Sequence, residues 1–237
     1  MQSRSEHTRR RLVRAGAELF DRNGYAQATL GQIAASAGLT KGALYFHFAS
    51  KDGLVEAIEE RAQGRLRDFV RRQREQRIPP VQSLIDLTHL LARTLHEDPV
   101  VRASFRIAQE SAGRQPPGAD FHQPYLAEAQ ALLGRARAEG ALRDPHLAEG
   151  ARALLSATVC GIAVLSATGS GHVEPGPGIT GLWDRLLPTL VPAGDLARYR
   201  THPPEDVPDG SPTAPGALDA PTAHDVPGTP DTDPRAA

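Results

Sequence analysis

Hydrophobic residues recur three or four positions apart along most of the first 190 residues, which is the spacing of helices with one buried face. In the stretch from Glu6 to Asn23, for example, Leu12, Val13 and Leu19 belong to one such stripe. No segment shows the strict alternation of polar and apolar residues that marks a half-buried strand. The pattern therefore predicts an all-α protein.

Two short helices joined by a glycine turn are predicted between residues 29 and 48. Thr29 is a good N-cap, and Gln32 three positions later completes a capping box. Gly38 supplies the left-handed residue that ends the first helix, and Thr40 can cap the second. A helix, a turn with glycine and a second helix form the arrangement that sets a recognition helix into a DNA major groove. This stretch is therefore predicted to bind DNA.

The second of these helices carries a distinctive set of basic and aromatic side chains. It contains Lys41, Tyr45 and His47 but no carboxylate, as expected for a helix that lies against phosphates. We expect Tyr45 and His47 to point outward, and Phe46 and Phe48 to point inward and pin the helix to its neighbours. The alternative for Tyr45 is an aromatic ring that merely packs.

Further helices are predicted behind this front module. A fourth helix, capped by Ser50, should end before Pro79-Pro80, and the seven arginines between Arg61 and Arg77 are interpreted as its solvated face. The remaining predicted helices run from Val81 past Leu95, from Pro99 to about Ala112, from Pro124 to Glu139, from Pro145 through Ala167, and around Leu182 to Leu190. The segment 151–167 is apolar nearly all round, so we expect part of it to face another subunit.

Charge is distributed unevenly along a chain whose net charge is only −1. Residues 1–55 hold eight Lys and Arg against four Asp and Glu, which favours a local surface for a polyanion. Residues 201–237 contain nine prolines and seven acidic residues but no aromatic residue, which is typical of a disordered tail.

Nothing in the sequence gives positive support to catalysis. Residues Gly176 to Gly181 match the letters G-x-G-x-x-G, but no strand precedes them and Pro177 stands inside the turn. Cys160 lies in the most apolar predicted helix, where a buried thiol is inert. We therefore expect a protein that is not an enzyme and uses no cofactor.

The histidines and the single cysteine give no support to a metal site or a disulfide. The nine histidines show no metal-ligand spacing, so no metal is expected, and His89, His96, His122 and His146 are interpreted as surface or loop residues. One cysteine excludes an internal disulfide and fits a reducing compartment. Because no apolar segment follows the early arginines, we expect no signal peptide, a cytoplasmic location and no membrane partner.

Residues 30–52 resemble the signature of the TetR family of repressors. The resemblance rests on Gln32-Ile-Ala, on the run Ala37-Gly-Leu-Thr-Lys-Gly-Ala-Leu-Tyr-Phe-His-Phe48, and on Ser50-Lys51. The run from Thr40 to Phe48 is similar to the γ-butyrolactone receptor branch found in Streptomyces and its relatives. Weaker agreement in Val101–Arg106 and Trp183–Pro188 extends the resemblance over about residues 6–192.

The resemblance implies an all-helical homodimer with an N-terminal helix-turn-helix DNA-binding domain and a C-terminal domain for ligand binding and dimerisation. The implied domains are 1–52, 53–195 and a disordered Pro/Asp-rich tail at 196–237. The implied DNA contacts are Thr29, Leu39, Thr40, Lys41, Gly42, Tyr45, His47 and Lys51. The implied ligand-binding residues are Gln63, Leu84, Leu87, Thr88, Leu91, Phe105, Ile107, Gln109, Tyr125, Thr158 and Trp183.

The expected function is that of a repressor released from a pseudo-palindromic double-stranded DNA operator by a small apolar ligand, in the control of secondary metabolism. Butyrolactone receptors often carry a tryptophan near the start of the helix that here begins at Pro124-Tyr125, and this chain has none there. An antibiotic or pathway intermediate is therefore as good a candidate ligand as a γ-butyrolactone hormone. The alternatives are a constitutive repressor with an unused cavity and, with less support, a helical enzyme.

Overall fold

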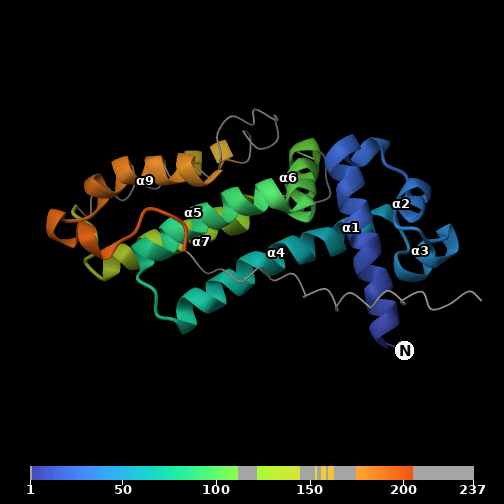
Figure 1. Ribbon diagram of the computed structural model, residues 1–237, viewed down its shortest axis with the longest axis horizontal. Coiled ribbons are helices and arrows are strands. Elements are labelled where there is room, and N and C mark those ends of the chain that lie inside the picture. Colours follow the sequence, from blue (N-terminus) through green and yellow to red (C-terminus); the bar gives the residue numbers. More distant parts are fainter. Residues whose placement is uncertain are drawn as a thin grey trace, which may run out of the picture. The chain divides into compact units, whose positions relative to one another are not determined.

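Every regular element in the described part of the chain is a helix, which confirms the all-α prediction (Figure 1). The computed structural model describes residues 2–111, 122–144, 153, 156–158, 160–162 and 175–204. In chain order the elements are α1 (Gln2–Gln27), α2 (Leu30–Ser36), α3 (Lys41–His47), α4 (Lys51–Glu75), α5 (Pro80–Glu97), α6 (Pro99–Ser111), α7 (His122–Ala138), α9 (Pro175–Leu190) and the 3-10 helix η2 (Ala193–Arg198). Most of the predicted loop 113–123, much of the predicted helix 145–167 and residues 205–237 lie outside the described residues.

The helix-turn-helix forms through the local signals that predict it. The Thr29 hydroxyl accepts from the N–H of Gln32 at 3.3 Å, and the Gln32 side-chain oxygen accepts from the N–H of Thr29 at 2.9 Å. Gly38 ends the first helix with a φ of 63°, which a glycine adopts without strain. The Thr40 hydroxyl then caps α3 by accepting from the N–H of Ala43 at 3.1 Å. The predicted capping box and turn are confirmed.

Loss of the capping box is expected to lower the stability of the front module by a small, measurable amount. Thr29→Ala leaves a helix N-terminus without its side-chain acceptor, so the free energy of unfolding should fall by about 1 kcal/mol. Thr8→Ala is the matched control, because the Thr8 hydroxyl donates to the Arg4 carbonyl inside α1 and caps no helix end. Thermal unfolding followed by circular dichroism should show a lower Tm for Thr29→Ala than for Thr8→Ala; equal values would contradict the role of the cap.

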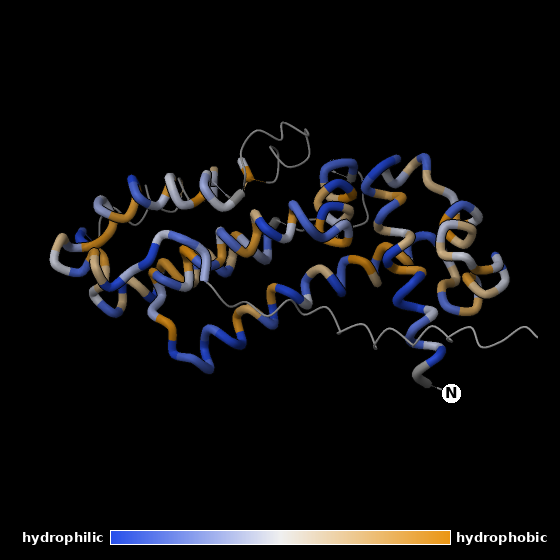
Figure 2. Tube along the Cα trace, viewed as in Figure 1, coloured by the Kyte–Doolittle hydropathy of each residue, from blue (hydrophilic) through white to orange (hydrophobic). Residues whose placement is uncertain are grey.

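Packing joins the front module to the helices behind it. Hydrophobic and hydrophilic residues are interspersed along the helices (Figure 2), and α1 lies against α2, α4 and, most extensively, α6. Leu12, Phe20 and Leu54 are fully buried where α1 and α4 contribute to this core. Arg11 of α1 is exposed, and its guanidinium also donates to the Ala37 carbonyl at the end of α2 at 2.6 Å. No described helix is long and apolar enough to span a membrane.

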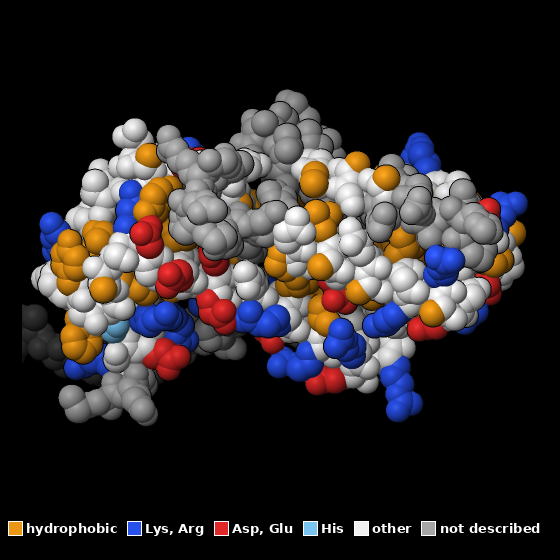
Figure 3. All heavy atoms as spheres, turned by 180° about the vertical axis from the view of Figure 1, so that it is seen from behind, with side chains coloured by type: hydrophobic (Ala, Val, Ile, Leu, Met, Phe, Trp, Pro, Cys, Tyr) orange, Lys and Arg blue, Asp and Glu red, His pale blue; other side chains and the backbone are white. Residues whose placement is uncertain are grey.

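Many arginines of α4 belong to a solvent-exposed, ion-paired face. Arg67 contacts Glu60 at 2.5 Å, and Arg71 contacts Asp68 at 2.9 Å. The surface drawn in Figure 3 likewise shows Lys and Arg side chains interspersed with those of Asp and Glu. Exposed pairs of this kind contribute little to stability, so their main effect is to keep the long helix solvated.

The C-terminal end of the folded part covers α5, which differs from the predicted domain boundary and from the predicted exposure of His89. Residues 196–204 belong to the same compact unit as the helices, so the folded part extends past the predicted boundary at 195/196. His89, expected at the surface, is only 5 % exposed, and its Nε2 lies 2.7 Å from the Thr201 carbonyl oxygen. The reason is tertiary: a segment more than 100 residues away along the chain covers this face of α5.

Stability is expected to fall as His89 becomes protonated. Burial lowers the pKa of His89, with Arg200 and His202 acting in the same direction, while the Thr201 carbonyl and Asp86 oppose the shift. As pH falls, His89 binds its proton in the unfolded chain at a higher pH than in the folded chain. The stability that the neutral, buried His89 contributes is therefore complete above about pH 6.5 and is lost as pH falls below that value. Urea unfolding between about pH 5.5 and 7.5 checks the slope. His89→Gln keeps a possible donor to Thr201 but does not titrate, so a variant with the same slope would contradict the assignment.

Cys160 also departs from expectation, because its side chain is exposed in this chain instead of buried. Ala153 and Ala157, at helical spacing before it, are exposed as well. These three small residues lie in the segment that the sequence predicts to face another subunit in part.

Candidate nucleic-acid interface and its connection to the helical body

Four of the eight predicted DNA contacts lie on α3, and the other four lie at the ends of the neighbouring helices and in the turn. Tyr45 is 48 % exposed, and the Nζ atom of Lys41 lies 5.9 Å from the centre of its ring. Thr29, Thr40, Lys41 and Gly42 are exposed, whereas Leu39, His47 and Lys51 are half-buried. The hydroxyl and ammonium groups of these residues are chemically suited to phosphate oxygens and guanine acceptors.

Phe46 corrects the prediction for the aromatic run. Leu44 and Phe48 are buried, whereas Phe46 is 81 % exposed. Leu44 and Phe48 stand four residues apart and so share one face of the helix, which puts Phe46 on the opposite side. The sequence contains a signal for this exposure, because the apolar Leu44 lies two positions before Phe46 and marks the buried face. Phe46 is thus a second outward-facing aromatic ring beside Tyr45.

Lys51 is held by aromatic rings at the base of α4. Its Nζ lies 4.1 Å from the centre of the Tyr25 ring and 3.5 Å from the Ala26 carbonyl oxygen. Partial burial lowers the pKa of Lys51, although Asp52 and Glu110 oppose the shift. Burial and the hydrogen bond to Asp52 raise the pKa of Tyr25 to about 12, so its hydroxyl stays a donor. These contacts hold the Lys51 ammonium group at a defined position on the front module.

Helix α6 contacts this site directly. A Glu110 oxygen accepts from the backbone N–H of Tyr25 at 2.9 Å, and the other is 3.0 Å from Arg106 Nε. Arg106 also donates to the Asp21 carbonyl, and Arg102 pairs with the Asp21 carboxylate at 2.8 Å. The ionic contacts of α6 thus meet α1 at the kink where Gly24 breaks its helical geometry.

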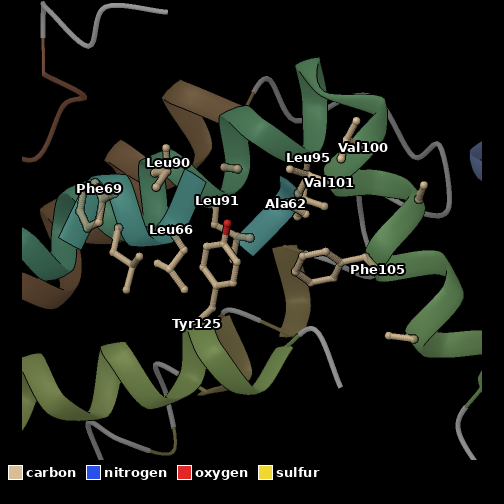
Figure 4. Close-up of a cluster of buried hydrophobic side chains, with 14 of the residues drawn as sticks. Ala62, Leu66, Phe69, Leu90, Leu91, Leu95, Val100, Val101, Phe105 and Tyr125 are labelled. Carbon is tan, nitrogen blue, oxygen red and sulfur yellow. The ribbon is translucent and has the colours of Figure 1, made fainter. Parts of the chain in front are cut away.

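The predicted ligand residues fall into two buried groups and several separate positions. Tyr125 of α7 is buried beside Phe105 and Leu91 (Figure 4), with the two ring centres 6.2 Å apart. Burial raises the pKa of Tyr125, while Thr94, a polar neighbour missing from the predicted set, opposes the shift.

The second buried group is a polar pair on α5 and α9. The Trp183 indole N–H donates to the Thr88 hydroxyl at 2.7 Å, and both side chains are buried. Leu84, Leu87 and Ile107 are also buried, whereas Gln63 and Thr158 are half-buried and Gln109 is exposed. Two cavities, of about 430 and 470 Å³, are lined by none of the predicted ligand residues.

Comparison with known proteins identifies the group to which this architecture belongs. Residues 12–58 match the family of bacterial regulatory proteins described as the tetR family. The A-factor receptor protein of Streptomyces griseus is 32 % identical over 203 residues, which cover 84 % of this chain and 69 % of that protein. CprB from Streptomyces coelicolor A3(2) has 31 % identity and a TM-score of 0.70, with 84 % and 95 % of the two chains covered.

A second CprB structure contains its biological operator sequence and has a TM-score of 0.66, again at 31 % identity over 84 % of this chain and 95 % of that chain. The chain therefore belongs to the TetR family of transcriptional regulators, in the branch that contains the γ-butyrolactone receptors. Its relatives are helix-turn-helix regulators, and this chain carries the same DNA-binding module.

Proposed function

We propose that this protein is a homodimeric, cytoplasmic repressor that a small molecule releases from a pseudo-palindromic operator. The single observation that carries the proposal is the direct contact of α6, part of the helical body, with the base of the DNA-binding module. The Glu110 carboxylate holds the Tyr25 backbone, and the Tyr25 ring holds Lys51. A movement of α6 therefore changes the position of α1 and of a predicted phosphate contact together.

Two copies of α3 would read the operator in the same way. Lys41 and Tyr45 project from the exposed face, and His47 lies at its edge. In a two-fold symmetric dimer these faces enter successive major grooves, so the half-sites are inverted repeats about one helical turn apart. The operator complex formed by CprB supports this mode of binding for a chain with the same fold.

The second subunit is expected on the face marked by Ala153, Ala157 and Cys160. These small side chains are exposed at residues in helical conformation, although the surrounding sequence is strongly apolar. Small residues allow two helices to approach closely, which makes this face suitable for an identical helix in a two-fold interface.

The ligand is expected to bind among Leu91, Phe105 and Tyr125, with the phenol as its polar partner. The A-factor receptor and the γ-butyrolactone receptors among the relatives support a lactone hormone, or an antibiotic or intermediate of the pathway under control. Release requires the ligand to bind the DNA-incompetent conformation more tightly, because equal affinity for both conformations shifts nothing. The middle of α6 contacts the core through Phe105, and its C-terminal end contacts α1 through Glu110, so α6 is the expected lever.

The Thr88–Trp183 hydrogen bond favours a second candidate, a constitutive repressor without a ligand. These two predicted polar ligand contacts already satisfy each other at 2.7 Å. A cavity filled by such internal contacts would leave the DNA-binding form unaffected by small molecules.

One set of experiments tests both candidates. The operator is selected from randomised duplexes, its affinity is measured by fluorescence anisotropy, and the mass of the free protein is measured by light scattering. We expect a dimer, an inverted-repeat site, and loss of binding with γ-butyrolactones or with antibiotics. Glu110→Gln, which weakens the hold of α6 on Tyr25, should alter release by the ligand more than Gln109→Glu on the exposed face. A monomer, or binding without sequence preference, would contradict the proposal; specific binding unaffected by every ligand would favour the constitutive repressor.

A further inference from the structure

A cavity of about 470 Å³ lies at the C-terminal end of α4, apart from every residue assigned above to DNA or ligand binding. Its walls come from α4, the joint before α5, α7 and η2. Each of these elements contributes one guanidinium group, from Arg74, Arg77, Arg135 and Arg198 respectively. A cavity of this size is typical of sites for small molecules.

The positive charge in this cavity is only partly balanced. Arg198 pairs with Asp195 at 3.1 Å, and Glu139 is the other acidic residue of the lining. Arg74, Arg77 and Arg135 make no ion pair with any residue that the structure describes, unlike Arg67 and Arg71 earlier on α4. Three guanidinium groups with unused donors therefore face one carboxylate across a space large enough for a ligand.

Arg77 has an unfavourable backbone conformation for an arginine. Helices α4 and α7 both end in a turn with one left-handed residue, which is Gly140 in α7 (φ 69°) but Arg77 in α4 (φ 53°). The turn after α4 is closed by the N–H of Ile78, which donates to the Gln73 carbonyl at 3.0 Å. Glycine adopts this conformation without cost, whereas a residue with a side chain is strained. The helix end by itself thus favours glycine, and an arginine there indicates a use for its guanidinium group.

We propose that this cavity binds a small multivalent oxyanion, a metabolite with phosphate groups or several carboxylates. Guanidinium groups form paired, charge-assisted hydrogen bonds with the oxygens of both, and groups from four elements can surround one ligand. The site is separate from the inducer site proposed above and does not depend on it.

Occupancy of the cavity would act on α4 through Gln73. This residue lines the cavity, donates to Asp86 at 3.3 Å and accepts from the Ser83 hydroxyl at 3.0 Å. An anion that draws Arg74 and Arg77 together therefore pulls on the end of a helix whose first turn lies beside the DNA-binding module. The anion is thus an effector distinct in place and chemistry from an apolar inducer.

Isothermal titration calorimetry on the full chain tests the site without DNA. The probes are pyrophosphate for the phosphate source and citrate for the carboxylate source, at an ionic strength held constant with chloride. We expect saturable binding of at least one probe, weakened roughly tenfold by Arg77→Gly and by Arg135→Gln, since each removes a charge-assisted hydrogen-bond donor. Arg137→Gln is the matched control, because Arg137 is exposed on the same helix but does not line the cavity.

Arg77→Gly gives a second readout that separates binding from folding. Removal of the strained side chain should raise the Tm by roughly 2 °C even as it lowers anion affinity. Saturation by pyrophosphate alone or by citrate alone supports the proposal and identifies the chemical class. Absence of saturable binding, or equal weakening by Arg137→Gln, overturns it. A raised Tm with unchanged affinity also overturns it, because the arginines would then only offset the negative ends of two helices.

Discussion

Tyr45→Ala is expected to weaken operator binding by roughly a hundredfold while the dimer stays folded. The side chain is 48 % exposed, so its removal opens no cavity in the core. A hydrogen bond from the phenol to a charged phosphate contributes about 1.5 kcal/mol, and a dimer loses two of them, which corresponds to about two powers of ten. Fluorescence anisotropy with the selected operator measures the change in affinity, and circular dichroism verifies the fold.

Two further variants separate the parts played by the aromatic rings and the hydroxyl. Tyr45→Phe should lose most of the same affinity if the hydroxyl holds the phosphate, and little of it if the ring only packs. Phe46→Ala removes the neighbouring exposed ring without touching Tyr45, which makes it the matched control for loss of aromatic surface. Wild-type affinity in Tyr45→Ala would contradict the assignment of α3 as the recognition helix.

Arg200→Ala is expected to destabilise the folded unit by about 2–4 kcal/mol, although the predicted domain bounds place this residue in the tail. Its guanidinium donates to Asp86 at 2.8 Å, and the Asp86 side chain is only 3 % exposed. Gln82 binds the same carboxylate and also both backbone groups of Arg200. Removal of the cation leaves a buried carboxylate without its ion pair, which costs far more than the loss of a surface pair.

Chemical unfolding with matched variants isolates this buried charge. Arg198→Ala removes a neighbouring, largely exposed guanidinium and should change the stability little. Asp86→Asn introduced into Arg200→Ala should recover part of the loss, because no buried charge then remains unpaired. If the two single arginine variants unfold alike, the segment around Arg200 does not fasten the C-terminal end to α5.

The sequence predicts most of the DNA-binding module because short-range signals determine its helix ends and its turn. The capping box at Thr29, the left-handed Gly38 and the cap at Thr40 involve residues within a few positions of one another, so their geometry is fixed by short-range chemistry. The predicted burial of Phe46 is wrong, because the position of a residue around the helix, and not its apolar type, decides whether it is buried here. Leu44 and Phe48 occupy the buried face, and no side chain two positions from either can share it.

Long-range contacts account for the parts that the sequence does not reveal. His89 and Asp86 are ordinary polar positions on a helical pattern until Arg200 and Thr201 cover them. The hydrogen bond from the Tyr25 N–H to Glu110 likewise joins residues 85 positions apart, and no periodic pattern in the sequence indicates it.

The sequence by itself determines the all-α fold, the helix-turn-helix and the family, because these depend on spacing, caps and a compact motif. Tertiary structure alone decides which charges are buried and paired, which arginines meet around the cavity at the end of α4, and how α6 contacts the DNA-binding module. The physical reason is that the energy of a polar or charged side chain depends on what surrounds it in space. Residues distant in the chain supply those surroundings, so no local pattern encodes them.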